Sequence, residues 1–109
     1  MMPLTVKKTD NGLVMEVKNQ NFCGADLSGD SFEKVEFVNC VFTDADFDST
    51  KFKRCVFVGC RFWCSKLQNA HFTYCKFDNC DFTCANVSNK AFNGCVIENC
   101  NFEDVNYKD

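Results

Sequence analysis

Residues 45–59 read ADFDSTKFKRCVFVG and place a phenylalanine at every fifth position. The same period of five runs without an insertion from Asn21 to Lys108, and its central positions are all apolar or aromatic. All 13 phenylalanines of the chain lie on this register, which predicts a repeat architecture. The central residues are Phe22, Leu27, Phe32, Phe37, Phe42, Phe47, Phe52, Phe57, Phe62, Leu67, Phe72, Phe77, Phe82, Val87, Phe92, Ile97, Phe102 and Tyr107.

A period of five fits neither of the common secondary structures. An α-helix repeats its faces every 3.6 residues, so residues five apart would spread around its surface. A strand alternates its faces every two residues, so an odd period would send successive phenylalanines to opposite sides. A chain that turns a corner every five residues can bury them all. The period therefore predicts short sides wound into coils that stack about 4.8 Å apart through backbone hydrogen bonds.

The residue two before each central residue should also point inward, and its identity indicates the number of sides. Cysteine recurs at this position in two columns, and small residues recur in a third. The columns are Cys40, Cys60, Cys80 and Cys100; Cys55, Cys75 and Cys95; and Ala25, Ala45, Ser65 and Ala85. Members of a column are twenty residues apart, so the sequence predicts four sides per coil and a square cross-section.

These residues resemble the pentapeptide-repeat family, whose pattern is a small residue, a polar residue, a central Leu or Phe and two tolerant positions. Residues 25–29 (ADLSG) and 45–49 (ADFDS) match it fully, and 80–84 (CDFTC) match with Cys in the small place. The resemblance implies an all-β fold, a right-handed quadrilateral parallel β-helix of about four and a half coils. Asp30 and Lys90 break the small-residue rule in one column, so we expect that side to be loosened or bulged near the first and last coils.

Residues 1–19 lie outside the period that starts at Asn21. Residues 4–8 and 13–18 alternate apolar and polar side chains, and the Asn11-Gly12 pair between them favours a tight turn. We expect a β-hairpin that caps the first coil, because an open solenoid end exposes apolar side chains and unpaired backbone. A frayed terminus is the alternative. The predicted division of the chain is a hairpin cap, 1–19, and a β-helix, 20–109.

The far end of the repeat shows no comparable cap. The last coil presents Phe92, Ile97, Phe102 and Tyr107 with nothing above them. Either polar residues blunt this edge in a monomer, or a second copy covers it. Members of the family often pair end to end, so the resemblance favours a homodimer through this end.

Ten cysteines in 109 residues raise the question of disulfides or a metal centre. Seven of them occupy the inward small position, where stacked side chains run parallel, so disulfides are not expected. Cys60 and Cys64 would point in and out, as would Cys80 and Cys84, so we expect no metal and no other cofactor. Cys64 and Cys84 should stack on one outer face, and Cys23 is the third outward thiol. These are expected to be inert surface groups, and reactive or oxidisable thiols are the alternative. Because no secretory signal or membrane span is visible, we expect reduced thiols in a cytoplasmic protein.

The residue types that carry catalysis are not assembled into any known pattern. His71 is the one histidine, and its stacked neighbours, Lys51 and Ala91, supply neither a nucleophile nor an orienting group. No glycine-rich phosphate loop, nucleophile elbow or pair of catalytic carboxylates is present. The sequence therefore predicts a protein that is not an enzyme.

Outward charges separate two functional hypotheses. Family members that confer quinolone resistance bind topoisomerases by imitating duplex DNA, which requires a long acidic rod. Residues 20–109 contain nine basic and thirteen acidic residues, which makes the body only mildly acidic. Asp46 should lie under Lys66, and Arg61 under Asp81, which predicts opposite-charge pairs between coils. Direct nucleic-acid binding would need an uncompensated basic stripe, which the net charge of −3 disfavours.

Outward apolar residues form the candidate interaction surface. Val38, Val56 and Val58 lie on one side of the coil, and Val41 and Trp63 lie on the adjoining side. Exposed apolar clusters often mark contact surfaces, although β-branched residues are also ordinary in strands. The sequence predicts a non-catalytic module that binds a protein partner or acts as a scaffold. The alternative is a DNA mimic that binds DNA gyrase or another topoisomerase.

Overall fold

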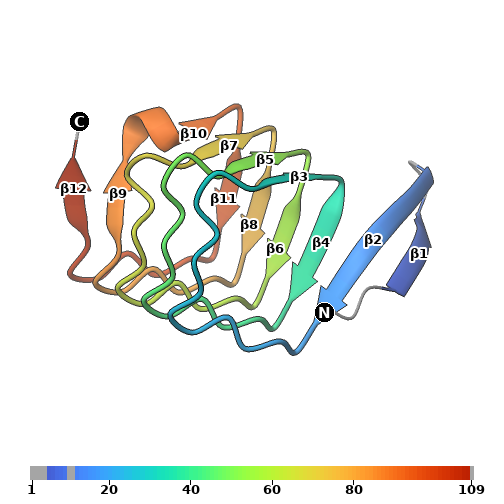
Figure 1. Ribbon diagram of the computed structural model, residues 1–109, viewed down its shortest axis with the longest axis horizontal. Helices are drawn as coiled ribbons and strands as arrows, with labels where there is room; N and C mark the ends of the chain where they lie inside the picture. Colours follow the sequence, from blue (N-terminus) through green and yellow to red (C-terminus); the bar gives the residue numbers. More distant parts are fainter. Residues whose placement is uncertain (1–4, 10–11, 109) are drawn as a thin grey trace.

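The computed structural model describes residues 5–9 and 12–108 and shows a four-sided solenoid of stacked parallel coils (Figure 1). Regular structure in these residues is β-strand, apart from one short 3-10 helix, Asn89–Ala91. The predicted all-β solenoid is confirmed. We number its sides 1 to 4 in chain order, so that Phe22, Leu27, Phe32 and Phe37 are central to sides 1 to 4 of the first coil.

The strands gather on three of the four sides and on the hairpin. The hairpin consists of β1 (Thr5–Thr9) and β2 (Gly12–Lys18). Side 3 carries β3 (Ser31–Glu33), β5 (Lys51–Lys53), β7 (His71–Thr73) and β10 (Phe92–Asn93). Side 4 carries β4 (Val35–Val38), β6 (Val56–Val58), β8 (Lys76–Asp78) and β11 (Val96–Glu98). Side 2 carries β9 (Asn86–Ser88) and β12 (Asn106–Lys108).

The core is a set of phenylalanine stacks held in a register of twenty. Phe37 pairs with Phe57, and Phe57 pairs with Phe77, along side 4. Their ring centroids are 5.0 and 4.9 Å apart and the rings are nearly parallel, at 6° and 5°. Rings on adjacent sides meet edge to face, as Phe57 and Phe62 do at 5.5 Å. Burying each phenylalanine is worth about 1.5–3 kcal/mol, so the stacks supply most of the driving force for folding.

Sides 1 and 2 close their corners with backbone hydrogen bonds. The carbonyl of the central residue accepts the N–H three residues later, as Phe42 does from Ala45 at 3.1 Å. An Asp or Asn before the central residue supports the turn, because its side chain accepts an N–H two residues later. Asp46 accepts in this way from Asp48 at 3.0 Å. This local bond gives a physical reason for the polar residue of the repeat on these two sides.

The inward cysteines tie each coil to the coil below at the corners after sides 3 and 4. Each thiol donates to the carbonyl of the central residue 23 positions earlier, at distances from 3.2 to 3.6 Å. Cys60 bonds to Phe37 at 3.3 Å, and Cys75 bonds to Phe52 at 3.4 Å. The cysteines are therefore weak donors as well as small apolar residues.

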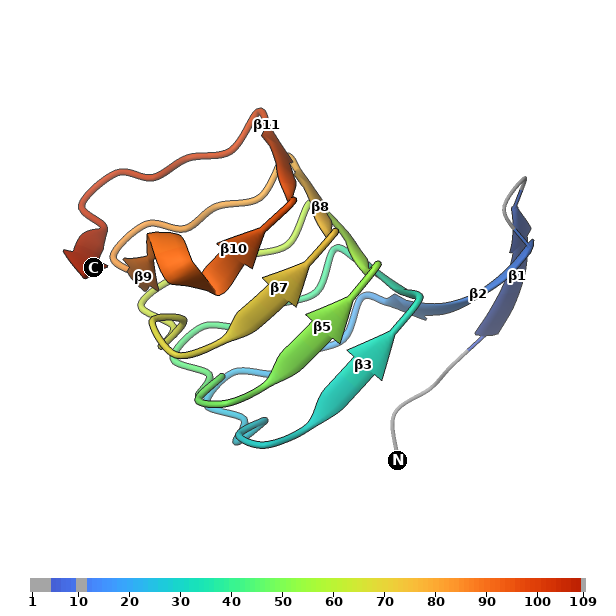
Figure 2. The ribbon, with the colours of Figure 1, turned by 90° about the horizontal axis from the view of Figure 1, so that it is seen from above.

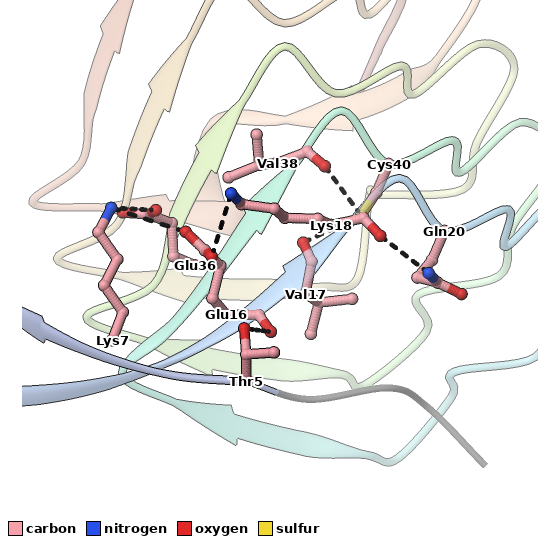
Figure 3. Close-up of polar contacts among 9 residues, drawn as sticks. All are labelled: Thr5, Lys7, Glu16, Val17, Lys18, Gln20, Glu36, Val38 and Cys40. Carbon is pink, nitrogen blue, oxygen red and sulfur yellow. Dashed lines mark hydrogen bonds and ion pairs between the residues drawn. The ribbon is translucent and has the colours of Figure 1, made fainter.

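The hairpin is confirmed, and it continues the side-4 column. β1 pairs antiparallel with β2, and β2 runs parallel to β4 with Val17 opposite Phe37. Val17 is completely buried, so the period of five begins one repeat earlier than Phe22. Two lysines and two glutamates form a group of ion pairs in which Lys7 links the hairpin to the coil (Figure 3). Lys7 reaches Glu36 at 3.0 Å and Glu16 at 3.6 Å, and Lys18 reaches Glu16 at 3.5 Å.

The expected distortion of one column is confirmed at Lys90 and wrong at Asp30. The 3-10 helix Asn89–Ala91 turns Lys90 outward and buries Ala91 in its place, and the side chain of Ser88 accepts the N–H of Lys90 at 3.2 Å. Around Asp30 the backbone is regular, and its N–H donates to Leu27 at 3.0 Å. Asp30 is exposed, so its carboxylate does not have to be accommodated in the core.

Candidate interaction surface

The predicted valine cluster lies on side 4, in strands β4 and β6. Val38 and Val58 are register partners on successive coils, so their side chains are neighbours on the outer face. Val56 lies between Glu36 and Lys76 in the same ladder. All three valines are half-buried. The cluster is therefore a narrow apolar strip with charged residues in the same columns.

Side 1 adds an aromatic side chain to this strip. Val41 pairs with Arg61, and the guanidinium carbon of Arg61 lies 4.3 Å from the centroid of the Trp63 ring. Trp63 keeps 40% of its surface exposed. The structure thus brings the five predicted residues onto two adjoining sides, with the tryptophan held by a cation–π contact.

The predicted stacking of opposite charges between coils is confirmed in register, but the stacked side chains do not form ion pairs in the described residues. Asp46 pairs with Lys66, and Arg61 with Asp81, in the ladder register. In the part of the chain that the structure describes, however, neither pair brings its charged atoms within 4.0 Å. Arg61 stacks on Trp63, and Asp81 accepts the hydroxyl of Thr83 at 2.6 Å. Partial burial works to raise the pKa of Asp81, but hydrogen bonds from Thr83 and Trp63 and the Arg61 charge hold that pKa below its ordinary value.

The four residues of the C-terminal end lie together on the last coil. Phe92 and Phe102 stack on the rings below them, with centroids 5.3 and 4.7 Å apart. Ile97 is 38% exposed and Tyr107 is 58% exposed. The hydroxyl of Tyr107 donates to the side chain of Asn89 at 2.6 Å, which ties β12 to the 3-10 helix. This end therefore presents apolar surface together with the backbone edge of the final coil.

Two further apolar features were missed by the sequence analysis. Among the residues that the structure describes, Leu13 and Val6 on the hairpin are the most exposed large hydrophobic residues, at 68% and 62%. Tyr74 is 59% exposed at the corner between sides 3 and 4, under the guanidinium of Arg54. The available signal was the length of the alternating segment 13–18, which exceeds one side of a coil.

The ten cysteines are all free. Cys64 and Cys84 stack at the corner after side 1, as predicted, and the contact between their thiols raises the pKa of Cys64 to about 11. Inside the coil, thiol contacts with Cys40 and Cys80, together with burial, raise the pKa of Cys60. Within residues 5–9 and 12–108, no three His, Cys, Asp or Glu side chains are grouped so that they could hold a metal ion.

Comparison with known proteins identifies the architecture. The family model for the pentapeptide repeat region matches residues 30–107. The chain belongs to the pentapeptide-repeat family. No curated protein sequence matches this member of the family. None of its described helices is long and apolar enough to span a membrane.

Solved structures of other pentapeptide-repeat proteins are similar to it. A trypsin-treated form of QnrB1, a plasmid-mediated fluoroquinolone resistance protein, has a TM-score of 0.54 and 24% identity. The match covers 83% of this chain and 46% of that chain, so this chain spans about half of its length. The pentapeptide repeat protein Rfr23 from the cyanobacterium Cyanothece 51142 has a TM-score of 0.41 and 9% identity, over 85% of this chain and 80% of that one. At 24% identity, the likeness to QnrB1 shows the fold alone.

Proposed function

We propose that this pentapeptide-repeat protein is a non-catalytic module that binds a protein partner, or holds partners together, in the cytoplasm. The observation that carries the proposal is that the chain fills the inside of the solenoid with its own side chains. Nine phenylalanines are less than 2% exposed. Recognition is therefore left to the outer sides and the two ends.

The surface formed by Val38, Val41, Val56, Val58 and Trp63 is the proposed contact. Tryptophan contributes strongly to interfaces because it buries a large rigid area with few rotatable bonds. Here the Arg61 guanidinium at 4.3 Å already restricts the Trp63 ring, which lowers the entropy lost on binding. The half-buried valines would surround this anchor and exclude water.

A pull-down from the native host tests this surface. Val58→Lys combined with Trp63→Ser should abolish capture of the partner, because a charge replaces the apolar strip and the anchor is lost. Thr73→Lys combined with Asn93→Ser makes matched changes on side 3 and should leave capture intact. Circular dichroism checks that both variants keep the β-solenoid. Equal capture by the two variants would retire the valine surface.

The C-terminal end is the proposed homodimer interface. The exposed Ile97 and Tyr107 and the backbone edge of the last described coil support this, because a second copy would cover both. Light scattering should give twice the chain mass for the native protein. Tyr107→Asp should halve that mass, since the charge would be buried in the interface. A native monomer, or an unchanged mass in the variant, would rule this interface out.

The alternative function is a DNA mimic directed at DNA gyrase or another topoisomerase. The structural likeness to a fluoroquinolone resistance protein favours it. The charge distribution disfavours it, because Lys51 and Lys53 on β5 and Lys34 and Arg54 at the next corner make this region basic. A gyrase supercoiling assay decides between the two. Inhibition, or protection from a quinolone, at micromolar protein would replace the protein-binding proposal.

A further inference from the structure

The hairpin is longer than the side of the coil to which it is paired. β2 has seven residues and β4 has four, and their pairing starts at Met15 opposite Val35. Gly12, Leu13 and Val14 have no partner in β4, because the coil turns its corner at Lys34. The hairpin therefore extends past the corner between sides 3 and 4, and β2 diverges from β4 towards its own first residues (Figures 1 and 2).

A groove of about 610 Å³ lies between this overhang and the corner. Leu13 and Val14 line it from the hairpin, and Val35, Val56 and Tyr74 line it from the coil. Its volume is in the range of sites that hold small ligands or a few side chains. Leu13 is 68% exposed along this groove, so an apolar group that entered it would cover surface that is now wetted.

The groove also carries positive charge that no residue of the described chain neutralises. Its one lining carboxylate, Glu36, is engaged by Lys7 at 3.0 Å, and Lys76 reaches Glu98 at 3.8 Å. Lys34 and Arg54 line it as well, and no carboxylate of residues 5–9 or 12–108 lies within 4.0 Å of either. Two cations therefore face the groove without a counter-charge.

The position of Arg54 is set before any ligand arrives. Its guanidinium carbon lies 5.3 Å from the centroid of the Tyr74 ring. That ring in turn lies over Gly94, where a Cβ atom would come within 2.7 Å of two ring carbons. The missing side chain at Gly94 gives Tyr74 its place, and Tyr74 supports Arg54. An arginine stacked on a ring can still pair its nitrogen atoms with a carboxylate.

We propose that this groove binds an extended acidic peptide segment of a partner protein, with a carboxylate on Lys34 and Arg54 and an aliphatic side chain between Leu13 and Val56. The proposal rests on the protein-binding role proposed above and gives it a second site, which shares only Val56 with the valine surface. A peptide fits better than single-stranded nucleic acid. The lining combines four aliphatic residues and charged side chains with one aromatic ring, whereas nucleic-acid sites offer several rings for base stacking.

Fluorescence anisotropy with a labelled peptide tests the groove on the full-length protein. The probe is a nine-residue peptide that alternates leucine and glutamate, and its control has glutamine in place of glutamate. The acidic peptide should bind about tenfold or more tightly than its neutral control, because only the first pairs with the two cations. Lys34→Asn combined with Arg54→Asn should weaken acidic-peptide binding by a similar factor. Asparagine tolerates the left-handed φ of 56° and 55° at these corners, so the coil is kept.

Two further variants make the test specific. Leu13→Asp should also weaken binding, because it puts a carboxylate where the leucine side chains of the probe would pack. Lys66→Gln combined with Lys90→Gln removes the same charge away from the groove and should change the dissociation constant less than about twofold. All these residues are exposed, which keeps the substitutions compatible with the fold.

Several results would overturn the proposal. These are a dissociation constant above about 1 mM for the acidic peptide, equal binding of the glutamine peptide, or an equal loss in the Lys66/Lys90 control. Tighter binding of a poly-dT oligonucleotide at the same salt would assign the groove to nucleic acid. Val58→Lys with Trp63→Ser should bind the probe normally, so failure of the valine surface and failure of the groove are seen separately.

Discussion

Sides 1 and 2 are built from the same five-residue unit as sides 3 and 4, but they fasten the central carbonyl differently. On sides 1 and 2 a backbone N–H of the same coil bonds to it, as Ala45 does to Phe42 at 3.1 Å. On sides 3 and 4 a cysteine thiol of the coil above bonds to it, as Cys60 does to Phe37 at 3.3 Å. The comparison explains the cysteine columns. Alanine is sufficient at the corner after side 1, where an N–H of the same coil caps the carbonyl. On sides 3 and 4 the central residues are partners in parallel strand ladders, and the thiol adds a side-chain donor from the coil above.

The largest expected effect is the loss of stability when a core phenylalanine is truncated. Comparing this loss on the two kinds of side tests whether they share one core. Phe57→Ala on side 4 and Phe62→Ala on side 1 should each cost about 3–5 kcal/mol in the free energy of unfolding, because both rings are fully buried. Urea denaturation followed by circular dichroism measures both losses. Similar values are expected, and a cost below about 1 kcal/mol for only one of them would mean that the sides are not equivalent in packing.

Substitutions at the two kinds of corner should cost less stability than the phenylalanine truncations, and the two costs should differ from each other. Cys60→Ala should cost about 1–2 kcal/mol, because it removes a buried sulfur and its bond to Phe37. Ser65→Ala should cost less, since the Phe62 carbonyl that accepts the Ser65 hydroxyl at 2.8 Å also accepts the N–H of the same residue at 3.2 Å. Urea midpoints of both variants check this. Equal losses would remove the distinction between the two kinds of corner.

The hydrogen bonds that Thr83 donates to the Asp81 carboxylate on side 1 should make the free energy of unfolding depend slightly on pH. The folded-state pKa of Asp81 is lowered, so its contribution is present above the unfolded-state pKa and is lost as pH falls through the folded-state value. Asp81→Asn should keep the turn and lose this dependence. Asp81→Ala should lose about 0.5–1 kcal/mol at neutral pH because the bond to Thr83 is gone. Urea melts of the three proteins between pH 2 and 7 measure it, and a steeper dependence in Asp81→Asn would contradict the assignment.

The last prediction concerns reactivity and involves no change in stability. Iodoacetamide should modify the outward thiols of the native protein and leave the five buried thiols unmodified. Cys64 should react more slowly than Cys23 at pH 8, because its pKa is raised to about 11 and the thiolate is scarce. Mass spectrometry of digests gives each rate. Fast labelling of Cys60 would show that the coils open readily at that corner.

The sequence predicted the coil, the number of sides and the stacking of like residues, because a strict period leaves few geometries that bury every phenylalanine. It did not predict features that depend on side-chain direction at a corner. Arg61 is the ladder neighbour of Asp81, as expected, but its guanidinium stacks on the Trp63 ring at 4.3 Å and forms no ion pair with Asp81. The 3-10 helix at Lys90 follows from the cost of burying a lysine, whereas Asp30 escapes that cost because it is exposed.

The candidate sites were less predictable than the fold. The five residues of the valine surface lie where the register places them, and their role stays a prediction, as does the division of the chain at residue 19. The overhang of β2 was not anticipated, because alternation alone does not show where a partner strand turns away. Lys34, Arg54 and Tyr74 are spaced by twenty residues, so the period places them in one column. The period does not show which outward contacts their side chains make.

Residues twenty positions apart stack on equivalent residues in each coil, and this repetition affects how such a chain can change its length. Removing residues 41–60 would join Cys40 to Arg61, and every lost neighbour would be replaced by its equivalent from the next level. Phe62 would then rest on Phe22 as Phe42 does now, at 5.1 Å. Duplication of the same segment would add one coil, and each new side chain would again stack on an equivalent residue. Evolution can therefore lengthen or shorten the solenoid by one coil at a time without changing the packing of its core.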